Sequence, residues 1–388
     1  MTVYIDGMSA FTPFGNLEQT WKSINNNEVC YGPITKFDPN ASRYTRSKVA
    51  GEFHFNAEDY PIITEAERDR IPEHMQWALA LASDLIGDKE LPKEQTSVIV
   101  SPGFSMYLES LRANRENTDN SYTFCPNMIA HNINIKYGYK GPSTMTMSAC
   151  STGIYSIILG AMMIETGQAD YVIAGSVDQC ITEDAFKQMG KLRALSTRYN
   201  DTPEVASRPW DTGRDGLVLS EGGGLVLLSS KKSENTICKI SSYAMTNDAY
   251  QVVAPHPEGE QIARCMNIAV DKHGSNPDLI NAHATSTPMG DTIELDAINR
   301  IGLGNIPLTA NKSQLGHMMG AAGIIEAIMS IQSLQTNTIT PTVNLYEPNE
   351  GYNPYIFPEA TKVENIESVM CNSFGFGGTN ASIIFEKT

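Results

Sequence analysis

Cys150 is the residue of this chain best suited to act as a nucleophile. It follows residues 143–147, which alternate as in a β-strand, and precedes residues 154–162, whose apolar side chains recur at helical spacing. We therefore expect the thiol at a strand-to-helix turn. The free N–H groups and partial positive charge of a helix N-terminus favour thiolate over thiol. A cysteine among small residues is more often inert packing, so this position alone does not establish catalysis.

Two histidines and a lysine occupy three further turns. His283 follows a short apolar strand that starts at Leu279, and Lys312 and His317 stand just before another helical segment. Imidazoles can donate hydrogen bonds and transfer protons near neutral pH. Taken singly, such a histidine is usually structural, and a lysine usually lies at the surface. A glycine-rich run at 372–380 completes the set.

Together these four blocks resemble the β-ketoacyl-acyl carrier protein synthases of the thiolase superfamily, and among them the synthase II type. The resemblance extends over nearly the whole chain, from residues 3–15 through 206–216 to the glycine run. It implies an α/β protein with the thiolase-like fold, in which two similar halves form five layers (αβαβα). A hydrophilic stretch at 229–236 leads us to expect halves at 1–235 and 236–388.

The resemblance also implies a reaction, the decarboxylative Claisen condensation of fatty acid biosynthesis. Cys150 would take an acyl group from a carrier-protein thioester. His283 and His317 would stabilise the enolate that forms when malonyl-acyl carrier protein loses CO2, and the product would be a 3-oxoacyl-acyl carrier protein. Lys312 would orient the histidines, with Glu326 as its partner. No tightly bound cofactor and no metal are expected, because the substrates are carried on the phosphopantetheine of acyl carrier protein.

By the same resemblance, the backbone N–H groups of Cys150 and Phe376 would form the oxyanion hole. Gly375 and Gly377 would let the backbone approach the substrate closely. Phe376 would also act as a gate between the acyl pocket and the malonyl site, and Phe374 would support it. In the alternative interpretation, Phe376 is an ordinary core residue without a catalytic role.

Polar residues after His283 allow two interpretations. Thr285 and Thr287 would bind the pantetheine arm by resemblance, or cap a helix that starts near Pro288, and both roles are compatible. Asp291 and Glu294 are expected to be charges in the first turn of that helix rather than catalytic acids.

Composition limits the classes of function. The chain has 388 residues, is 41% hydrophobic and carries a net charge of −16, which argues against nucleic acid as the main partner. Seven cysteines without CxxC spacing argue against a disulfide framework and for a reducing, cytoplasmic location. No secretion signal is visible at the N-terminus, and no apolar stretch of about 18 residues suggests a membrane span.

Binding of an acidic carrier protein to this acidic chain requires a local basic patch. The best candidate is a set of four basic side chains. The alternative, in which these residues form only a solvated surface without a partner, is weighed equally. Residues 65–73, where the family has a basic helix, carry mixed charges here, which suggests a dedicated carrier of a specialised polyketide or aryl polyene pathway. The cations of the proposed carrier patch are Lys187, Lys191, Arg193 and Arg198.

Three assemblies or activities compete. We expect a homodimeric synthase. A heterodimer with a related subunit, or a role as a non-catalytic chain-length subunit, is the second possibility, although such subunits lack the cysteine. Thiolase-like cleavage with coenzyme A is the third, but Cys371 precedes the glycine run instead of lying within it.

We further expect a surface loop at 112–122, and a bulge or turn at 221–224 between two apolar strands.

Overall fold

The computed structural model describes residues 1–105, 127–348 and 355–388. The surface loop expected at 112–122 lies outside these residues. Eleven of the described strands form one mixed sheet in the order β12-β11-β15-β16-β10-β1-β9-β7-β5-β6, with β2 beside β1. Two half-sheets meet where β1 pairs with β10. Small additional sheets join β3, β4 and β8, and β13 with β14.

Each half-sheet contains five main strands. Those of the first half are β1 (Val3–Thr12), β5 (Thr96–Pro102), β6 (Ser143–Thr144), β7 (Tyr171–Asp178) and β9 (Gly222–Ser229). Those of the second half are β10 (Cys238–Asn247), β11 (Leu279–Asn281), β12 (Leu308–Thr309), β15 (Ser368–Gly375) and β16 (Thr379–Glu386). The short strands are β2 (Gly15–Asn16), β3 (Gly32–Pro33), β4 (Val49–Gly51), β8 (Leu219–Ser220), β13 (Thr338–Ile339) and β14 (Thr361–Lys362).

The two half-sheets have the same topology. Counted within each half, the order of the main strands is 3-2-4-5-1 in both. The first strand is antiparallel to the fifth and the fifth to the fourth, whereas the fourth, second and third run parallel. The chain is therefore an internal duplication, which the sequence alone did not reveal. The proposed boundary at 235/236 falls between β9 and β10 and stays a prediction.

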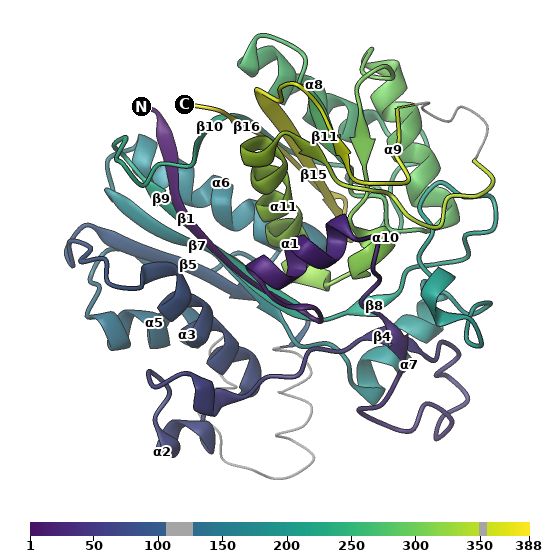
Figure 1. Cartoon of the computed structure of the whole chain (residues 1–388), viewed down its shortest axis with the longest axis horizontal. Coiled ribbons are helices and arrows are strands. Elements are labelled where there is room, and N and C mark those ends of the chain that lie inside the picture. Colours follow the sequence, from purple (N-terminus) through teal and green to yellow (C-terminus); the bar gives the residue numbers. More distant parts are fainter. Residues whose placement is uncertain (106–126, 349–354) are drawn as a thin grey trace.

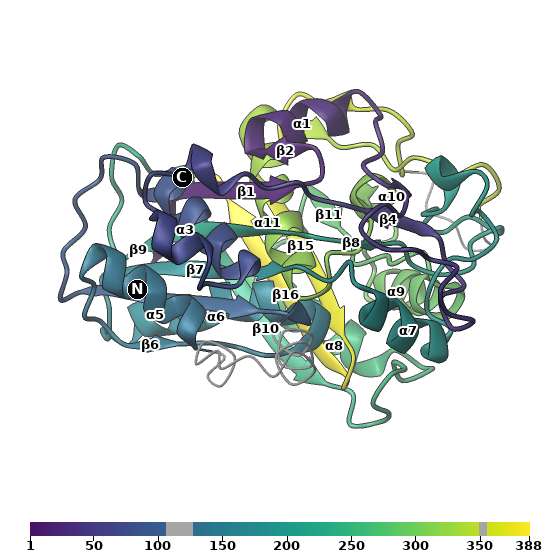
Figure 2. The same cartoon turned by 90° about the horizontal axis from the view of Figure 1, so that it is seen from below.

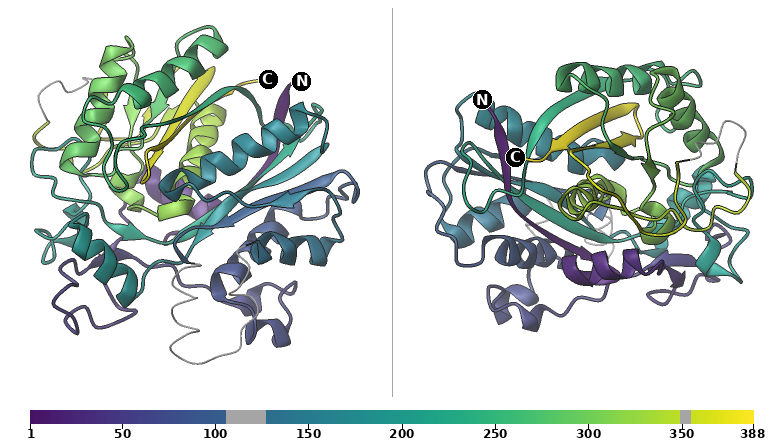
Figure 3. Two further views of the ribbon diagram at one scale, coloured as in Figure 1. Left: turned by 180° about the vertical axis from the view of Figure 1, so that it is seen from behind. Right: turned by 45° about the horizontal axis from the view of Figure 1, so that its top comes forward.

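Helices separate and cover the half-sheets. The longer ones are α1 (Leu17–Asn25), α3 (Glu73–Ile86), α5 (Met128–Tyr137), α6 (Thr152–Glu165), α7 (Glu183–Leu192), α8 (Glu260–His273), α9 (Pro288–Arg300) and α11 (Ala322–Thr336). The short ones are α2 (Glu65–Arg68) and α10 (Lys312–Leu315). Figures 1 and 3 show α6 and α11 between the half-sheets, and the two helices contact each other there.

The outer layers complete a five-layered arrangement. On one side α3 and α5 cover the first half-sheet, as Figure 2 shows from that side, and on the other α8 packs on the second half-sheet and against α9. The middle helices carry apolar residues all round, which suits burial on every side. The largest core cluster joins α6 and α11 to strands of both halves. The expected αβαβα fold is thus confirmed.

Two details of the expected strands were wrong. The break expected at 221–224 is confined to Glu221, between β8 and β9, and the glycines at 222–224 lie inside β9. A Cβ on Gly223 would stand 2.4 Å from Val177, and one on Gly224 would stand 2.7 Å from the side chain of Ile328 in α11. Glycine there permits close packing of strand and helix. The strand expected at 143–147 ends at Thr144, because the N–H of Thr146 donates to the Ser101 hydroxyl at 2.9 Å instead of to a neighbouring strand.

Candidate active site

Cys150 lies at the predicted junction, in a 3₁₀ turn (Ala149–Ser151) that leads into α6. Ala149 has a φ of 49°, so the backbone reverses sharply before the thiol. The hydroxyl of Thr152 accepts the N–H of Ser148 at 2.9 Å, and the hydroxyl of Ser151 donates to the Ser148 carbonyl at 2.7 Å. Side chains of the turn thus satisfy both backbone hydrogen-bonding groups of Ser148.

The second half repeats this turn, and the repeat brings His317 to the thiol. A 3₁₀ turn (Met319–Ala321) precedes α11, and Met319 has a φ of 47°. The first turns of α6 and α11 touch so closely that a Cβ on Gly153 would lie 2.4 Å from the backbone N of Ile324. Because His317 lies two residues before the second turn, the crossing of the two helices places it beside the first turn.

Three predicted side chains converge at this crossing. Nε2 of His317 lies 3.0 Å from Sγ of Cys150. The rings of His283 and His317 stand nearly perpendicular, with centroids 5.6 Å apart, and Phe374 packs edge-on against His283 at 5.9 Å. Exposed fractions are 5% for Cys150, 7% for His283 and 1% for His317. The structure therefore assembles the thiol and both imidazoles in one nearly closed site.

Lys312 is buried behind His283. Its Nζ donates to the His283 carbonyl at 2.7 Å, lies 3.2 Å from Nδ1 of His283 and forms a short ion pair with Glu326. The partner proposed from the sequence is thus in contact. Since an ammonium group can only donate, Nδ1 accepts, and the ring proton of His283 resides on Nε2, which faces the site.

Charge in this site is set by burial and by Lys312. Burial, followed by the positive charge of Lys312, holds the pKa of His283 and of His317 well below the usual range. Both rings are neutral at pH 7. Burial raises the pKa of Glu326 to about 7, and Lys312 opposes that rise.

The expectation of a thiolate at Cys150 was wrong. Burial raises the pKa of Cys150 to about 11, although the charge of Lys312 and the N–H of Phe376 both act to lower it. Loss of water around the sulfur outweighs the favourable end of the helix. The resting side chain is a neutral thiol, and the neutral Nε2 of His317 is placed to receive its proton.

Alkylation should report this raised pKa. With a pKa of about 11, about 0.01% of Cys150 is thiolate at pH 7. Its rate of reaction with iodoacetamide should rise about tenfold per pH unit from pH 7 to 9.5, whereas a small thiol levels off above about pH 8.5. The rate is measured by peptide mapping over time. A rate at Cys150 that stays flat across this range would contradict the assignment of a resting thiol.

The glycine-rich run lies against the cysteine turn. The backbone N–H of Phe376 bonds to Cys150, and the hydroxyl of Ser373 donates to the Cys150 carbonyl at 3.1 Å. A Cβ on Gly375 would lie 2.6 Å from the Ser148 carbonyl oxygen, so glycine is needed there, and Gly377 has a φ of 81°. This geometry is compatible with the oxyanion hole, which stays a prediction.

The ring of Phe376 is half-buried and packs against an apolar cluster that includes Met319 and, at its edge, Phe104. The backbone N–H of the same residue contacts Cys150. Its role as a gate also stays a prediction.

Thr285 and Thr287 lie together beside His283. Their hydroxyl oxygens are 3.0 Å apart, and Thr287 caps α9 by accepting the N–H of Gly290 at 3.2 Å. The capping role is confirmed for Thr287, and contact of the two threonines with pantetheine stays a prediction.

Asp291 lies in the first turn of α9 as expected, whereas Glu294 lies one turn later, which corrects its expected position. Both are buried. Glu294 accepts the N–H groups of His283 and Ala284 at 2.8 and 2.7 Å, and Asp291 accepts the N–H of Trp210 at 3.0 Å. The chain folds back over the N-terminal part of α9, so these carboxylates face inward. Glu294 is therefore a residue that positions His283, and sequence reasoning missed it.

Replacing Glu294 with glutamine should loosen His283. The amide keeps one acceptor oxygen and turns an NH2 group toward a backbone donor, which costs about 1–3 kcal/mol of positioning or stability. We expect slower condensation with unchanged acyl loading, measured with carrier-bound substrates alongside thermal unfolding. Asp296→Asn, an exposed change on the same helix, is the matched control. Equal behaviour of the two variants would contradict the positioning role.

The proposed carrier patch lies apart, around the end of α7. Lys187 is paired with Glu183 at 2.6 Å, and Lys191 lies over the ring of Tyr44 at 5.5 Å. Arg193 and Arg198 line a surface pocket of about 240 Å³. Because Lys187 is already paired with Glu183, it should contribute less than the arginines to binding of the carrier protein.

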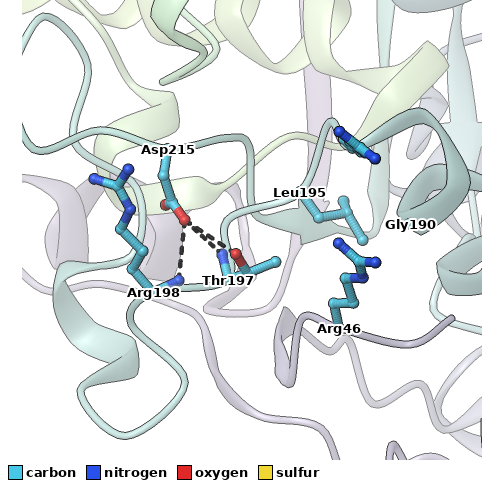
Figure 4. Close-up of a pocket in the computed structure, with 7 residues that line it drawn as sticks. Arg46, Gly190, Leu195, Thr197, Arg198 and Asp215 are labelled. Atoms are coloured by element: carbon cyan, nitrogen blue, oxygen red, sulfur yellow. Dashed lines mark hydrogen bonds between the residues drawn. The ribbon is translucent and has the colours of Figure 1, made fainter. Parts of the chain in front are cut away.

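The same pocket includes Arg46, which the sequence analysis did not identify (Figure 4). Asp215 accepts the backbone N–H groups of Thr197 and Arg198 at 2.9 and 3.0 Å, which fixes this loop (Figure 4). The Arg198 side chain is exposed. Arg46 comes from a distant segment of the chain, so no local spacing could have linked it to the other two arginines.

Comparison with known proteins agrees with this fold. Residues 1–234 match the family model of the beta-ketoacyl synthase N-terminal domain, and residues 237–346 match that of the C-terminal domain. The 3-oxoacyl-acyl-carrier-protein synthase 2 of Vibrio cholerae is 34% identical over 99% of both chains. That of Coxiella burnetii is 34% identical over 99% of this chain and 98% of its own.

Solved structures are similar throughout. A beta-ketoacyl synthase from Burkholderia phymatum has a TM-score of 0.89 at 26% identity, covering 100% of this chain and 99% of its own. A ketosynthase in complex with its type II polyketide acyl-carrier protein has a TM-score of 0.87 at 22% identity, with the same coverage. Fold and site define the class of condensing acyltransferases with a thiolase-like fold. The chain belongs to the beta-ketoacyl synthase family.

Within the described residues, no helix is both long and apolar enough to cross a lipid bilayer.

Proposed function

We propose that this enzyme condenses an acyl group held on Cys150 with malonyl-acyl carrier protein, forming 3-oxoacyl-acyl carrier protein in fatty acid biosynthesis. The observation that carries the proposal is the contact of 3.0 Å between the Cys150 thiol and a neutral His317, with His283 beside them. The names of the relatives from Vibrio cholerae and Coxiella burnetii support the same reaction.

Acyl loading begins with the thiol. Nε2 of His317 takes the proton of Cys150 as the sulfur attacks the carrier thioester, and a carbon–sulfur bond forms. The tetrahedral oxyanion is held by the N–H groups of Cys150 and Phe376. The bond to the carrier's sulfur then breaks, and that sulfur leaves with the proton from His317. The acyl group is now a thioester of Cys150.

Condensation takes place in the same site after the Cys150 thiol has become a thioester. Malonyl carrier loses CO2, and the electron pair of the broken bond forms an enolate. Nε2–H of His283 donates to the enolate oxygen, and His317 donates from its own Nε2 once its ring proton has moved there from Nδ1. The enolate carbon attacks the Cys150 thioester, a carbon–carbon bond forms and the bond from the acyl carbon to the Cys150 sulfur breaks. The released sulfur takes the Nε2 proton of His317, and solvent returns a proton to Nδ1 of that ring.

We further propose that the substrates arrive on the phosphopantetheine of acyl carrier protein, with no tightly bound cofactor, and that Thr285 and Thr287 contact this arm. The neighbouring ketosynthase solved with its carrier supports such a partner. We expect a homodimer in the cytoplasm. The unpaired state of the six cysteines in the described part of the chain is compatible with a reducing compartment.

Charge reversal should test the proposed carrier patch. The double variant Lys191→Glu and Arg198→Glu should raise KM for acyl carrier protein about tenfold or more, with kcat nearly unchanged, because docking and not chemistry is weakened. Adding Arg46→Glu should enlarge the effect. Arg264→Glu, an exposed change on α8, is the control. If the double variant keeps the parent KM at low ionic strength, the patch is elsewhere.

A specialised polyketide or aryl polyene pathway is the second candidate, because the mixed charges of α2 and the small patch suggest a dedicated carrier. The ketosynthase solved with its type II polyketide acyl-carrier protein, at 22% identity, shares the fold. Mass spectrometry with a panel of acyl carriers distinguishes the two. Preferential loading of saturated acyl chains supports fatty acid biosynthesis, and preferential loading of polyene chains supports the specialised pathway.

A further inference from the structure

The thiol and the two imidazoles also form a ligand set for a thiophilic divalent cation. One ligand atom from each of Cys150, His283 and His317 lies within 4.8 Å of the others. Tetrahedral zinc holds sulfur at about 2.3 Å and nitrogen at about 2.0–2.1 Å, which places the ligand atoms about 3.3–3.6 Å apart. The contact of Cys150 with His317, at 3.0 Å, would have to open by about 0.5 Å.

We propose that Cys150, His283 and His317 bind a zinc-type divalent cation that competes with acyl loading, so that this metal is a reversible inhibitor. Three protein ligands of this kind leave a fourth position of the tetrahedron for water. Binding converts the thiol into a metal thiolate, with the sulfur proton released to solvent and no change of oxidation state. An acyl group on Cys150 removes the sulfur ligand, so acyl-enzyme and metal-bound enzyme exclude each other.

The surroundings of the site make the metal exchangeable. Metal-bound histidines usually donate their second ring N–H to an acceptor. Here Nδ1 of His283 faces the ammonium of Lys312 at 3.2 Å. A metal on Nε2 would shift the ring proton to Nδ1, so that an N–H donor would face the ammonium donor. The charge of Lys312 also repels a dication, and the ion pair with Glu326 offsets only part of that repulsion. Lys312 therefore opposes the cation while it supports the condensation chemistry.

The test uses Co²⁺ alone, added to the full chain in thiol-free buffer, and needs no carrier protein. We expect one tetrahedral Co²⁺ per chain, with a thiolate-to-cobalt charge-transfer absorption that Zn²⁺ abolishes by displacement. Cys150→Ser should remove this absorption, and His283→Ala should weaken binding about tenfold or more. Cys30→Ala, which removes a half-buried thiol outside the site, is the control and should bind like the parent.

Lys312→Met gives the most specific outcome, because it should tighten Co²⁺ binding about tenfold although it impairs catalysis. Prior alkylation of Cys150 in the parent protein should abolish binding, which tests the site even if a variant folds poorly. The proposal is overturned if the absorption survives alkylation of Cys150, if it is lost in Cys30→Ala, or if a folded Lys312→Met binds more weakly than the parent. Since no acyl substrate is present, these results are independent of the proposed condensation.

Discussion

Cys150→Ala should lose acyl loading and condensation by a factor of about 10⁴ or more, because no other described side chain at the site can form the thioester. Condensation is measured as 3-oxoacyl product from acyl and malonyl carriers. The variant should still release CO2 from malonyl carrier, since both imidazoles remain in place. Decarboxylation thus serves as an internal check that the variant is folded.

Cys371→Ala is the matched control for this variant. Cys371 is fully buried in β15, and a thiolase-like reaction would need a second reactive cysteine. We expect Cys371→Ala to retain both loading and condensation. If it loses condensation while Cys150→Ala retains it, the assignment of the nucleophile is wrong.

His283→Ala should separate the two half-reactions. His283 supplies the Nε2–H for the enolate oxygen, and loss of one such donor typically costs about 100- to 1000-fold in rate. Acyl loading should continue, because His317 and not His283 contacts the thiol. Decarboxylation and condensation are measured with malonyl carrier, and loading with acyl carrier alone.

His317→Ala is the informative comparison for that experiment. It removes the proton acceptor of the thiol and an enolate donor together, so loading and condensation should both fall. If His283→Ala reduces loading as strongly as condensation, the division of roles between the two histidines is contradicted.

Much of the site could be predicted from the sequence, because local blocks carry it. The cysteine turn, the two histidines and Lys312 each lie at the end of a strand or the start of a helix, where short-range patterns are informative. The cap of α9 at Thr287 follows from the same local rules. The partner of Lys312, Glu326, came from the resemblance and is confirmed by direct contact.

What the sequence could not supply depends on tertiary contacts. The pKa of Cys150 follows from burial by residues of both halves, which no local pattern reveals. Glu294 looks like a helix-start charge until the chain is seen to fold back over it. In the sequence, the successive glycines of β9 suggest a turn. Only the structure shows that the side chains of Val177 and Ile328 pack against them and leave no room for a Cβ. The internal duplication is recognised from the strand order that the two halves share, and not from the sequence.

The most direct test of the central claim is the mass of the parent enzyme after incubation with an acyl-acyl carrier protein, followed by peptide mapping. The covalent role of Cys150 predicts the gain of one acyl group per chain, found on the peptide that contains Cys150 and released by hydroxylamine as a thioester. An acyl group on another residue, or turnover to product with no covalent adduct on Cys150 at any time, would contradict it.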